Sequence, residues 1–251
     1  MRPSHCFTFT FDDERAVNDQ LHNAERVAFA RALEELQPAF GLRLNERVIS
    51  QLVAHYELLG EWNRRMNLTS LIDPVEAARF HYLESLYATR HFQPQIRSVI
   101  DVGSGAGFPG FPIAIFVPTL RVVLVESQMR KVVFLRLAAR RLGVKNLSVF
   151  HGRFQEYPSR DFDAILCRAL DRFQEQLPEL LRLGSAAEQI LIFAGRELAK
   201  QCRVLSRDRW RVTQHTIPLS RRRVLISLRP TGFTWNDTTS SIEGGNTIGF
   251  T

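Results

Sequence analysis

The chain has 251 residues, of which 45% are hydrophobic and 24% charged, a composition typical of a globular protein with one large domain or one domain and a small companion. Its formal net charge of +7 favours a polyanionic partner such as nucleic acid without requiring one. The three cysteines form no C-x-x-C pair, and no apolar run approaches the roughly 20 residues of a membrane helix, so we expect no metal site, no disulfide framework, no membrane span and a cytoplasmic location.

The first third of the chain is predicted to be helical. Residues 1–22 are mostly polar and are expected to form a disordered extension. Apolar residues at helical spacing then predict a helical N-terminal region over residues 23–93. Asn45 is a suitable N-cap for the second helix, and Asp73 followed by Pro74 is typical of the start of the third. The expected helices cover residues 24–36, 45–62 and 74–89.

From residue 94 onward, short apolar runs alternate with helical patterns. The expected strands cover residues 97–103, 121–127, 146–152, 162–170 and 189–195, with helices at 111–118, 131–143 and 175–184. Continuous apolar strands alternating with helices predict a parallel α/β sheet covered on both faces. Two further strand-like runs, at 211–220 and 221–229, predict a C-terminal antiparallel hairpin that closes this sheet, so that the domain covers residues 94–230. Residues 231–251 are rich in Thr, Ser and Gly and are expected to form a flexible tail.

The stretch DVGSGAGFPGFP follows the first of these strands and carries two overlapping glycine patterns. Gly105, Gly107 and Gly110 spell the G-x-G-x-x-G of a dinucleotide-binding turn. Gly103, Gly105 and Gly107, preceded by Asp101, spell D-x-G-x-G-x-G, a pattern seen in S-adenosylmethionine-dependent methyltransferases. A glycine at position 103 already ends the strand, and prolines flank Gly110, where they would stiffen a pyrophosphate-binding turn. Both features favour the methyltransferase pattern.

Two acidic residues at strand ends are candidate cofactor ligands. Glu126 ends the second strand, where a carboxylate can accept hydrogen bonds from both ribose hydroxyls of either cofactor; the alternative is a solvated surface acid. Asp101 could orient the amino group of a bound methionine moiety, or it could hold the loop by accepting hydrogen bonds from backbone amides.

Four longer stretches identify a family. EWNRRMNLTSLIDPVEAARFHYLESL, VIDVGSGAGFPGFPIAI, ESQMRKVVFL and CRAL resemble the GidB/RsmG family, bacterial methyltransferases that form 7-methylguanosine in small-subunit (16S) ribosomal RNA. The resemblance covers roughly residues 31–229. It implies a Rossmann-like class I methyltransferase sheet with a helical N-terminal part, S-adenosylmethionine as donor, and small-subunit ribosomal RNA or a ribosomal particle as partner. We expect the protein to be a monomer.

The resemblance also implies site residues. For the cofactor they are Gly103, Gly105, Gly107, Phe108, Phe154, Gln155 and Arg168. For RNA they are Arg130, Lys131 and Arg153, to which we add Arg196, because it follows the place where the family carries lysine. A basic helix face that contacts RNA phosphates is predicted from Arg130 and Lys131 together with Arg136, Arg140 and Arg141. His81 is expected to support the cofactor loop. An acid would be more usual than Gln155, and a serine more usual than Cys167.

The chemistry expected from this family needs few catalytic groups. Methyl transfer from a sulfonium is an in-line displacement, and guanine N7 has a lone pair and no proton to lose, so no general base is required. Arg168 is the one predicted catalytic residue, in contact with guanine O6, a phosphate or the cofactor carboxylate; a structural ion pair is its alternative role. Cys167 could be a nucleophile for methylation of cytosine carbon, but a core position suits it better.

Two other functional classes remain open from the sequence. The glycine loop and Glu126 would also suit a nicotinamide-dependent oxidoreductase. A non-catalytic RNA-binding or ribosome-assembly protein could retain the same cofactor-shaped domain.

Overall fold

The structure is a computed structural model that describes residues 11–70, 73–168, 173–206 and 209–231. The predictions of a disordered start and a flexible tail therefore lie outside the described residues for 1–10 and 232–251. Within the described residues, no helix is both long and apolar enough to cross a membrane.

The N-terminal part is helical, as predicted. Its elements are α1 (Phe11–Leu36), η1 (Gln37–Phe40), α2 (Glu46–Met66), α3 (Pro74–Glu76), the π-helix η2 (Ala77–Leu83), α4 (Glu84–Tyr87) and η3 (Ala88–His91). The predicted caps are confirmed: Asn45 Oδ1 accepts a hydrogen bond from Val48 N at 2.9 Å, and Asp73 Oδ1 accepts one from Glu76 N at 2.8 Å.

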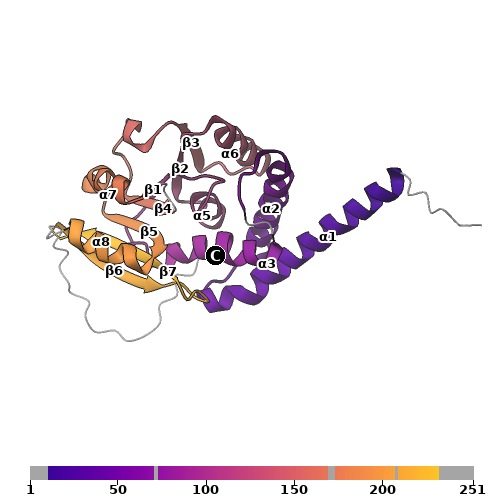
Figure 1. Ribbon diagram of the computed structural model, residues 1–251, viewed down its shortest axis with the longest axis horizontal. Helices are drawn as coiled ribbons and strands as arrows, with labels where there is room; N and C mark the ends of the chain where they lie inside the picture. Colours follow the sequence, from indigo (N-terminus) through magenta and orange to yellow (C-terminus); the bar gives the residue numbers. More distant parts are fainter. Residues whose placement is uncertain (1–10, 71–72, 169–172, 207–208, 232–251) are drawn as a thin grey trace, which may run out of the picture.

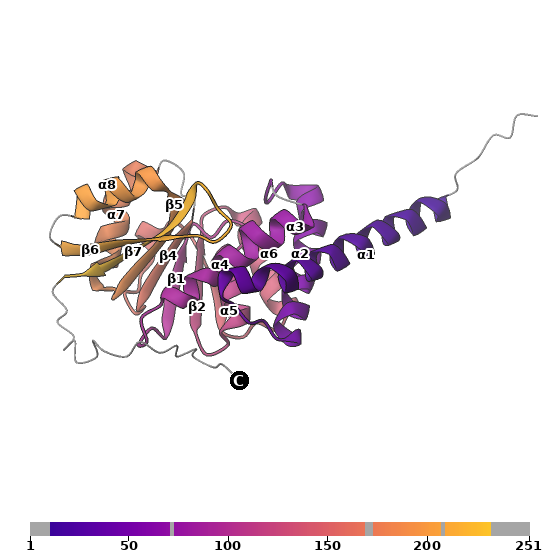
Figure 2. The ribbon, with the colours of Figure 1, turned by 90° about the horizontal axis from the view of Figure 1, so that it is seen from below.

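One boundary in this part was predicted wrongly. Helix α1 begins at Phe11 rather than at residue 24, so residues 11–22 are helical, whereas a disordered extension was predicted. The first turns of α1 extend away from the rest of the molecule (Figures 1 and 2). Residues 11–22 are mostly polar in sequence, which gave no basis for predicting a helix start before residue 24.

The remainder of the chain forms the predicted sheet. Its strands are β1 (Ser98–Val102), β2 (Arg121–Glu126), β3 (Leu147–His151), β4 (Ala164–Arg168), β5 (Gln189–Gly195), β6 (Trp210–Thr216) and β7 (Arg223–Pro230). Their order in space is β3-β2-β1-β4-β5-β7-β6. Strands β1 to β5 are parallel, whereas β7 is antiparallel to both β5 and β6, which confirms the closing hairpin. Strand order reverses between β1 and β4, the point at which open α/β sheets bind ligands.

Helices cover both faces of the sheet. The connecting elements are α5 (Gly110–Phe116), α6 (Met129–Arg141), η4 (Phe154–Glu156), α7 (Phe173–Leu183), η5 (Gly184–Ala186) and α8 (Arg196–Ser206). Figure 2 shows α7 and α8 on one side of the sheet and α2, α5 and α6 on the other. One core cluster unites the N-terminal helices, α5, α6 and the sheet face beneath them, while a second lies between the sheet and α7 and α8. The N-terminal helices therefore share a core with the sheet and can contribute to its ligand site.

Helix α8 is absent from the predicted elements. Ala199 and Cys202 are fully buried, and Val204 and Leu205 are exposed. Leu198, Ala199 and Cys202 share the face of α8 that packs on the core, a short apolar stripe that the sequence analysis overlooked.

Candidate active site

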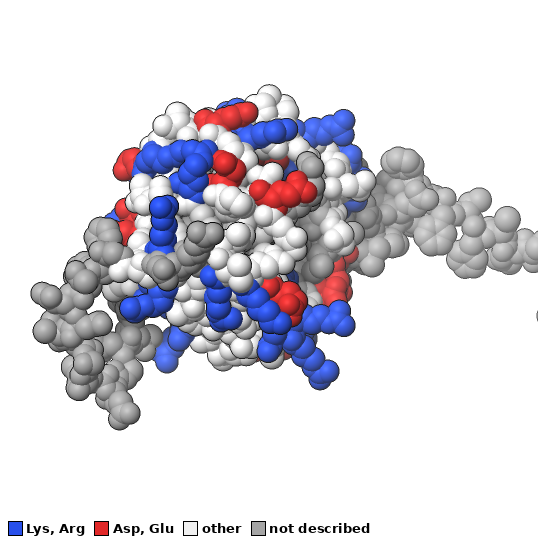
Figure 3. Space-filling view, turned by 60° about the vertical axis from the view of Figure 1, so that its left-hand side comes forward, with Lys and Arg blue, Asp and Glu red and all other residues white. Residues whose placement is uncertain are grey.

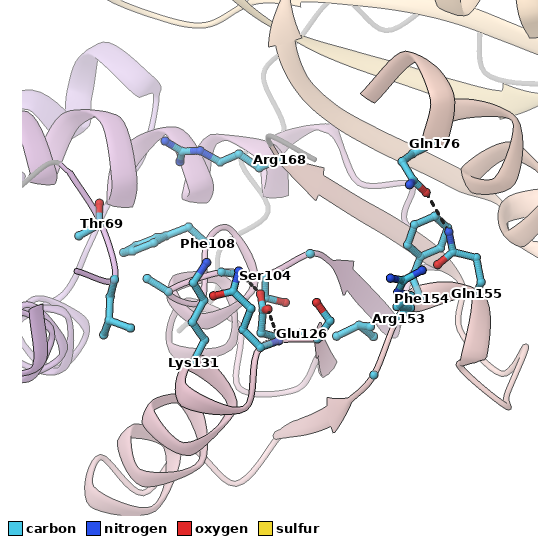
Figure 4. Close-up of a pocket in the computed structure, with 18 of the residues that line it drawn as sticks. Thr69, Ser104, Phe108, Glu126, Lys131, Arg153, Phe154, Gln155, Arg168 and Gln176 are labelled. Atoms are coloured by element: carbon cyan, nitrogen blue, oxygen red, sulfur yellow. Dashed lines mark hydrogen bonds between the residues drawn. The ribbon is translucent and has the colours of Figure 1, made fainter. Parts of the chain in front are cut away.

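A cavity of about 450 Å³ lies at the carboxyl ends of β1, β2, β3 and β4 and extends to the N-terminal helices. Its lining residues are Leu68, Thr69, His81, Gly103, Ser104, Gly105, Ala106, Phe108, Val125, Glu126, Ser127, Gln128, Lys131, Gly152, Arg153, Phe154, Gln155, Arg168 and Gln176. Figure 4 shows Thr69, Phe108 and Arg168 toward the helical side of the cavity, and Gln155 and Gln176 at its other end. Residues from six elements and their loops thus meet in one place.

The glycine loop after β1 requires glycine for two physical reasons. Gly103, Gly105 and Gly107 have φ angles of +69°, +59° and +100°, a backbone conformation that residues with a Cβ atom rarely adopt. At Gly107 a Cβ would also lie 3.0 Å from Leu135 Cδ2. At Gly105 the nearest atom to a Cβ is a backbone oxygen 4.0 Å away, so the space beside this residue is open on the cavity side. The loop therefore presents bare backbone to whatever occupies the cavity.

Glu126 is built into this loop. It is only 5% exposed, so the alternative of a solvated surface acid is wrong. Its Oε2 accepts a hydrogen bond from Gly105 N at 2.9 Å, and its Oε1 accepts one from Gln128 N at 2.7 Å. Each carboxylate oxygen can accept a further hydrogen bond. The side chain is thus fixed in place and retains the capacity to accept hydrogen bonds from two hydroxyl groups.

Asp101 lies beneath the loop and is not among the residues that line the cavity. It is fully buried, and its Oδ2 accepts a hydrogen bond from Gly110 N at 2.9 Å. Burial raises the pKa of its carboxyl to about 7, against the opposing effects of the Gly110 hydrogen bond, Ser104 and Arg168. Of the two roles considered for Asp101, its observed contacts are those of holding the loop.

A chain of hydrogen bonds connects the N-terminal helices to the end of β4. Thr69 N donates to Asn63 Oδ1 at 2.8 Å, and Thr69 Oγ1 lies 2.9 Å from His81 Nε2. Arg168 Nη2 lies 3.3 Å from His81 Nδ1. Because arginine can only donate, Nδ1 is the acceptor, and the proton of a neutral His81 is on Nε2, where it is donated to Thr69. Asn67, with φ of +48°, ends α2 in the left-handed conformation that turns the chain toward this network.

His81 and Phe108 join this network to the glycine loop. Their rings stack with centroids 4.6 Å apart, and Tyr82 meets Phe108 edge to face at 5.1 Å. Burial, reinforced by the charge of Arg168, lowers the pKa of His81 to about 3, so its imidazole is neutral near pH 7. This stacking places His81 against the glycine loop, as expected of a residue that supports it.

The far end of the cavity carries the residues predicted to follow β3. Phe154 is buried, and the exposed amide of Gln155 donates from Nε2 to Gln176 Oε1 at 2.8 Å (Figure 4). Gln176, on α7, was missed because it is one polar residue on an amphipathic helix. Thr69, Ser104 and Gln128 were also missed. Ser104 lies within the glycine motif and Gln128 directly after the second strand, so proximity to predicted site residues was the only available signal.

The predicted RNA-binding residues divide into two groups. Lys131 and Arg153 line the cavity, whereas Arg130, which is exposed, and Arg196, at the exposed start of α8, do not. Cys167 is fully buried in β4, as expected of a core residue. Arg168 lines the cavity and forms no direct ion pair among the described residues, although the negative charges of Glu84 and Asp101 act on it.

Comparison with known proteins identifies the family of the chain. A solved structure of a SAM dependent methyltransferase from Aquifex aeolicus has a TM-score of 0.47 and 17% identity, covering 61% of this chain and 92% of that one. The ribosomal RNA small subunit methyltransferase G of Alkalilimnicola ehrlichii is 36% identical over 67% of this chain and 76% of its own length. That of an Exiguobacterium strain is 37% identical over 53% of this chain and 59% of its own. The GidB family model, described as rRNA small subunit methyltransferase G, matches residues 48–219, and the chain therefore belongs to this family.

Proposed function

We propose that the chain transfers a methyl group from S-adenosylmethionine to N7 of a guanosine in small-subunit (16S) ribosomal RNA, acting as a monomer in the cytoplasm where ribosomes are assembled. The observation that carries the proposal is the cavity at the strand-order reversal, formed by the bare glycine loop and the fixed carboxylate of Glu126 in a chain of the GidB family. Membership of this family removes the support for a nicotinamide-dependent oxidoreductase.

The residues present fit S-adenosylmethionine. The bare backbone at Gly105 leaves room that a Cβ would fill, which suits close approach of the methionine moiety. The fixed oxygens of Glu126 suit the two ribose hydroxyls. Phe154 offers an apolar surface for adenine, and the Gln155 amide offers both a donor and an acceptor for its edge.

When bound, S-adenosylmethionine supplies an activated methyl group on a positively charged sulfur. The protein's part is to hold donor and acceptor in line, which alone is worth several kcal/mol of the barrier, roughly 7–11 in favourable intramolecular systems. Arg168 lies at the end of β4, on the cavity wall. Its charge would oppose the cationic product if it pointed at N7, so it acts from the O6 or phosphate side of the nucleotide. The neutral His81 holds Arg168 without adding another positive charge.

Basic residues at the cavity suit RNA. Lys131 and Arg153 line the cavity itself, and Arg130 is exposed next to Lys131 in α6. Figure 3 shows one face of the molecule on which Lys and Arg side chains are interspersed with Asp and Glu. Phosphate contacts are therefore expected at particular places and not over a uniformly basic surface. RNA binding should weaken steeply with salt, in proportion to the number of phosphates contacted.

The experiment that tests this function measures cofactor and substrate together. Thermal unfolding is followed with S-adenosylhomocysteine or NAD, and methyl incorporation is followed with small-subunit RNA and with small subunits, both lacking the modification. We expect stabilisation by S-adenosylhomocysteine alone and incorporation into RNA. Stabilisation without incorporation into either RNA or particles would favour the non-catalytic assembly factor, and stabilisation by NAD would contradict the proposal.

A further inference from the structure

A buried carboxylate lies beside the cavity and takes no part in the reaction described above. Glu84, the first residue of α4, is fully buried. Its Oε2 lies 3.0 Å from Arg223 Nη1, yet neither carboxylate oxygen makes a hydrogen bond with any residue that the structure describes. Burial raises the pKa of this carboxyl, and three guanidinium groups, of Arg223, Arg168 and Arg79, oppose that rise. These three arginines and Glu84 are called the arginine cluster below.

The arginine cluster is assembled from distant parts of the chain. Arg223 begins β7 and Arg168 ends β4, whereas Arg79 belongs to the π-helix η2. In that helix Glu84 N donates to Arg79 O, five residues earlier, so the wider turn brings these two residues next to each other. The N-terminal helices, the sheet and the closing hairpin therefore each contribute charge at one point.

The cluster has more positive charge than it can neutralise. Three guanidinium groups and one carboxylate leave a formal charge of +2 if all are ionised, and Asp101, which also acts on Arg168, offsets at most one of these charges. Burial and the neighbouring charge of Arg223 lower the pKa of Arg168 to about 10, a sign that these cations repel each other. Arg79 Nε and Arg168 Nη1 are buried and have no hydrogen-bond partner among the described residues. Unpaired buried donors in an excess of positive charge favour an anionic acceptor from outside the chain.

The position of the cluster indicates which anion it binds. Only Arg168 lines the cavity; Arg79 and Arg223 do not. The Arg223 side chain is 30% exposed, against 1% for Glu84, so the cluster is open to solvent on the side of β7. The exposed Arg221 and Arg222 precede it there. A ligand that reaches from the cavity to this surface is a polymer and not the small cofactor.

We propose that Arg79, Arg168 and Arg223, gathered around Glu84, form a binding site for one phosphate of the RNA strand adjacent to the acceptor guanosine. The inference rests on the proposed function. Glu84 has the role of a positioning residue, because its ion pair holds Arg223 beside the cavity. Guanidinium groups suit this task, since they donate several hydrogen bonds to phosphate oxygens and remain charged.

The test compares RNA and cofactor binding in single variants. Arg79→Gln and Arg223→Gln are titrated with unmodified small-subunit ribosomal RNA, in the presence of S-adenosylhomocysteine and over a range of KCl concentrations. Each is expected to weaken RNA binding about tenfold or more. The slope of log K against log salt should fall by about 0.7–0.9, the value for one phosphate contact. Affinity for S-adenosylhomocysteine should not change.

Arg160→Gln is the matched control. Arg160 is exposed and precedes the amino end of β4, whereas the cavity lies at the carboxyl ends of the strands, so this variant loses the same charge away from the cavity and should bind RNA like the wild type. If Arg223→Gln is unstable because Glu84 is left unpaired, the double variant Glu84→Gln with Arg223→Gln removes that carboxylate, and it should show the same loss of RNA affinity.

Three results would overturn the inference. Unchanged RNA affinity and salt slope in Arg79→Gln and Arg223→Gln would show that no phosphate binds there. A loss of S-adenosylhomocysteine affinity with an unchanged salt slope would assign the cluster to the cofactor carboxylate. Wild-type protein that neither binds nor methylates small-subunit RNA would contradict the proposed function itself, before any variant is compared.

Discussion

Substitution of Gly105 by alanine tests the effect on cofactor affinity separately from the effect on the stability of the fold. Gly105 has φ of +59°, and its added Cβ would meet nothing closer than 4.0 Å within the protein. Gly143, at the end of α6, has φ of +63°, and nothing lies within 4 Å of its added Cβ. Both alanines should therefore cost the same backbone strain, about 1–2 kcal/mol of unfolding free energy. Only Gly105 lines the cavity, so only Gly105→Ala should also affect cofactor affinity.

The size of that effect follows from the added methyl group. A methyl placed in space that the cofactor needs costs about 1–3 kcal/mol, roughly a tenfold to hundredfold loss of affinity. With S-adenosylhomocysteine at a hundred times the wild-type Kd, the ligand stabilises wild-type protein by about 2.7 kcal/mol. For Gly105→Ala the same concentration should add only about 0.4–1.4 kcal/mol.

The assay is thermal unfolding with and without S-adenosylhomocysteine. Wild-type protein and Gly143→Ala should each gain roughly 5–11 °C in Tm on adding the ligand, and Gly105→Ala at most about half of that. A full ligand-induced shift in Gly105→Ala would refute the assignment of this loop to the cofactor. A reduced shift in both alanine variants would show that the loss comes from strain in the fold and not from the site.

Three further predictions concern residues around the cavity. Arg168→Ala should lower kcat/KM for methyl transfer at least about tenfold while Tm stays near that of the wild type, and near-normal activity would remove Arg168 from the site. Asp101→Asn keeps an acceptor for Gly110 N. Because burial raises the folded-state pKa of Asp101 to about 7, its stabilising contribution is complete below the unfolded pKa and is lost as pH rises from about 4 to 7. Urea unfolding at pH 5 and 8 should therefore show a smaller loss of stability at the higher pH in Asp101→Asn than in the wild type, and equal losses would contradict the burial argument. Asn63→Ala leaves Thr69 N without its acceptor and should lower the free energy of unfolding by about 1–3 kcal/mol, measured by urea titration.

Sequence patterns predicted the parts of the molecule that depend on local chemistry. The parallel strands, the closing hairpin and the caps at Asn45 and Asp73 follow from apolar periodicity and from the first-turn amides that a helix leaves unpaired. The positive φ angles at Gly103, Gly105 and Gly107 could likewise be anticipated from the glycines themselves, because only glycine adopts such angles without strain.

What the sequence did not predict depends on contacts between distant residues. Gln176 meets Gln155 across 21 positions, and Arg168 meets His81 across 87, spacings that no periodic pattern encodes. The arginine cluster needed the π-helix as well, because an ordinary helical turn would not pair Arg79 with Glu84 in the same way. Helix α8, in contrast, has a local signal in Leu198, Ala199 and Cys202, which share its buried face and were overlooked.

The most direct measurement identifies the methylated nucleoside. Purified protein is incubated with methyl-labelled S-adenosylmethionine and small subunits that lack the modification, and the RNA is then digested to nucleosides and separated by mass. The account predicts label in 7-methylguanosine, at a rate that falls at least about tenfold in Arg168→Ala. Label in another nucleoside would contradict the assignment of guanine N7, and the absence of label in protein that binds S-adenosylhomocysteine would contradict catalysis.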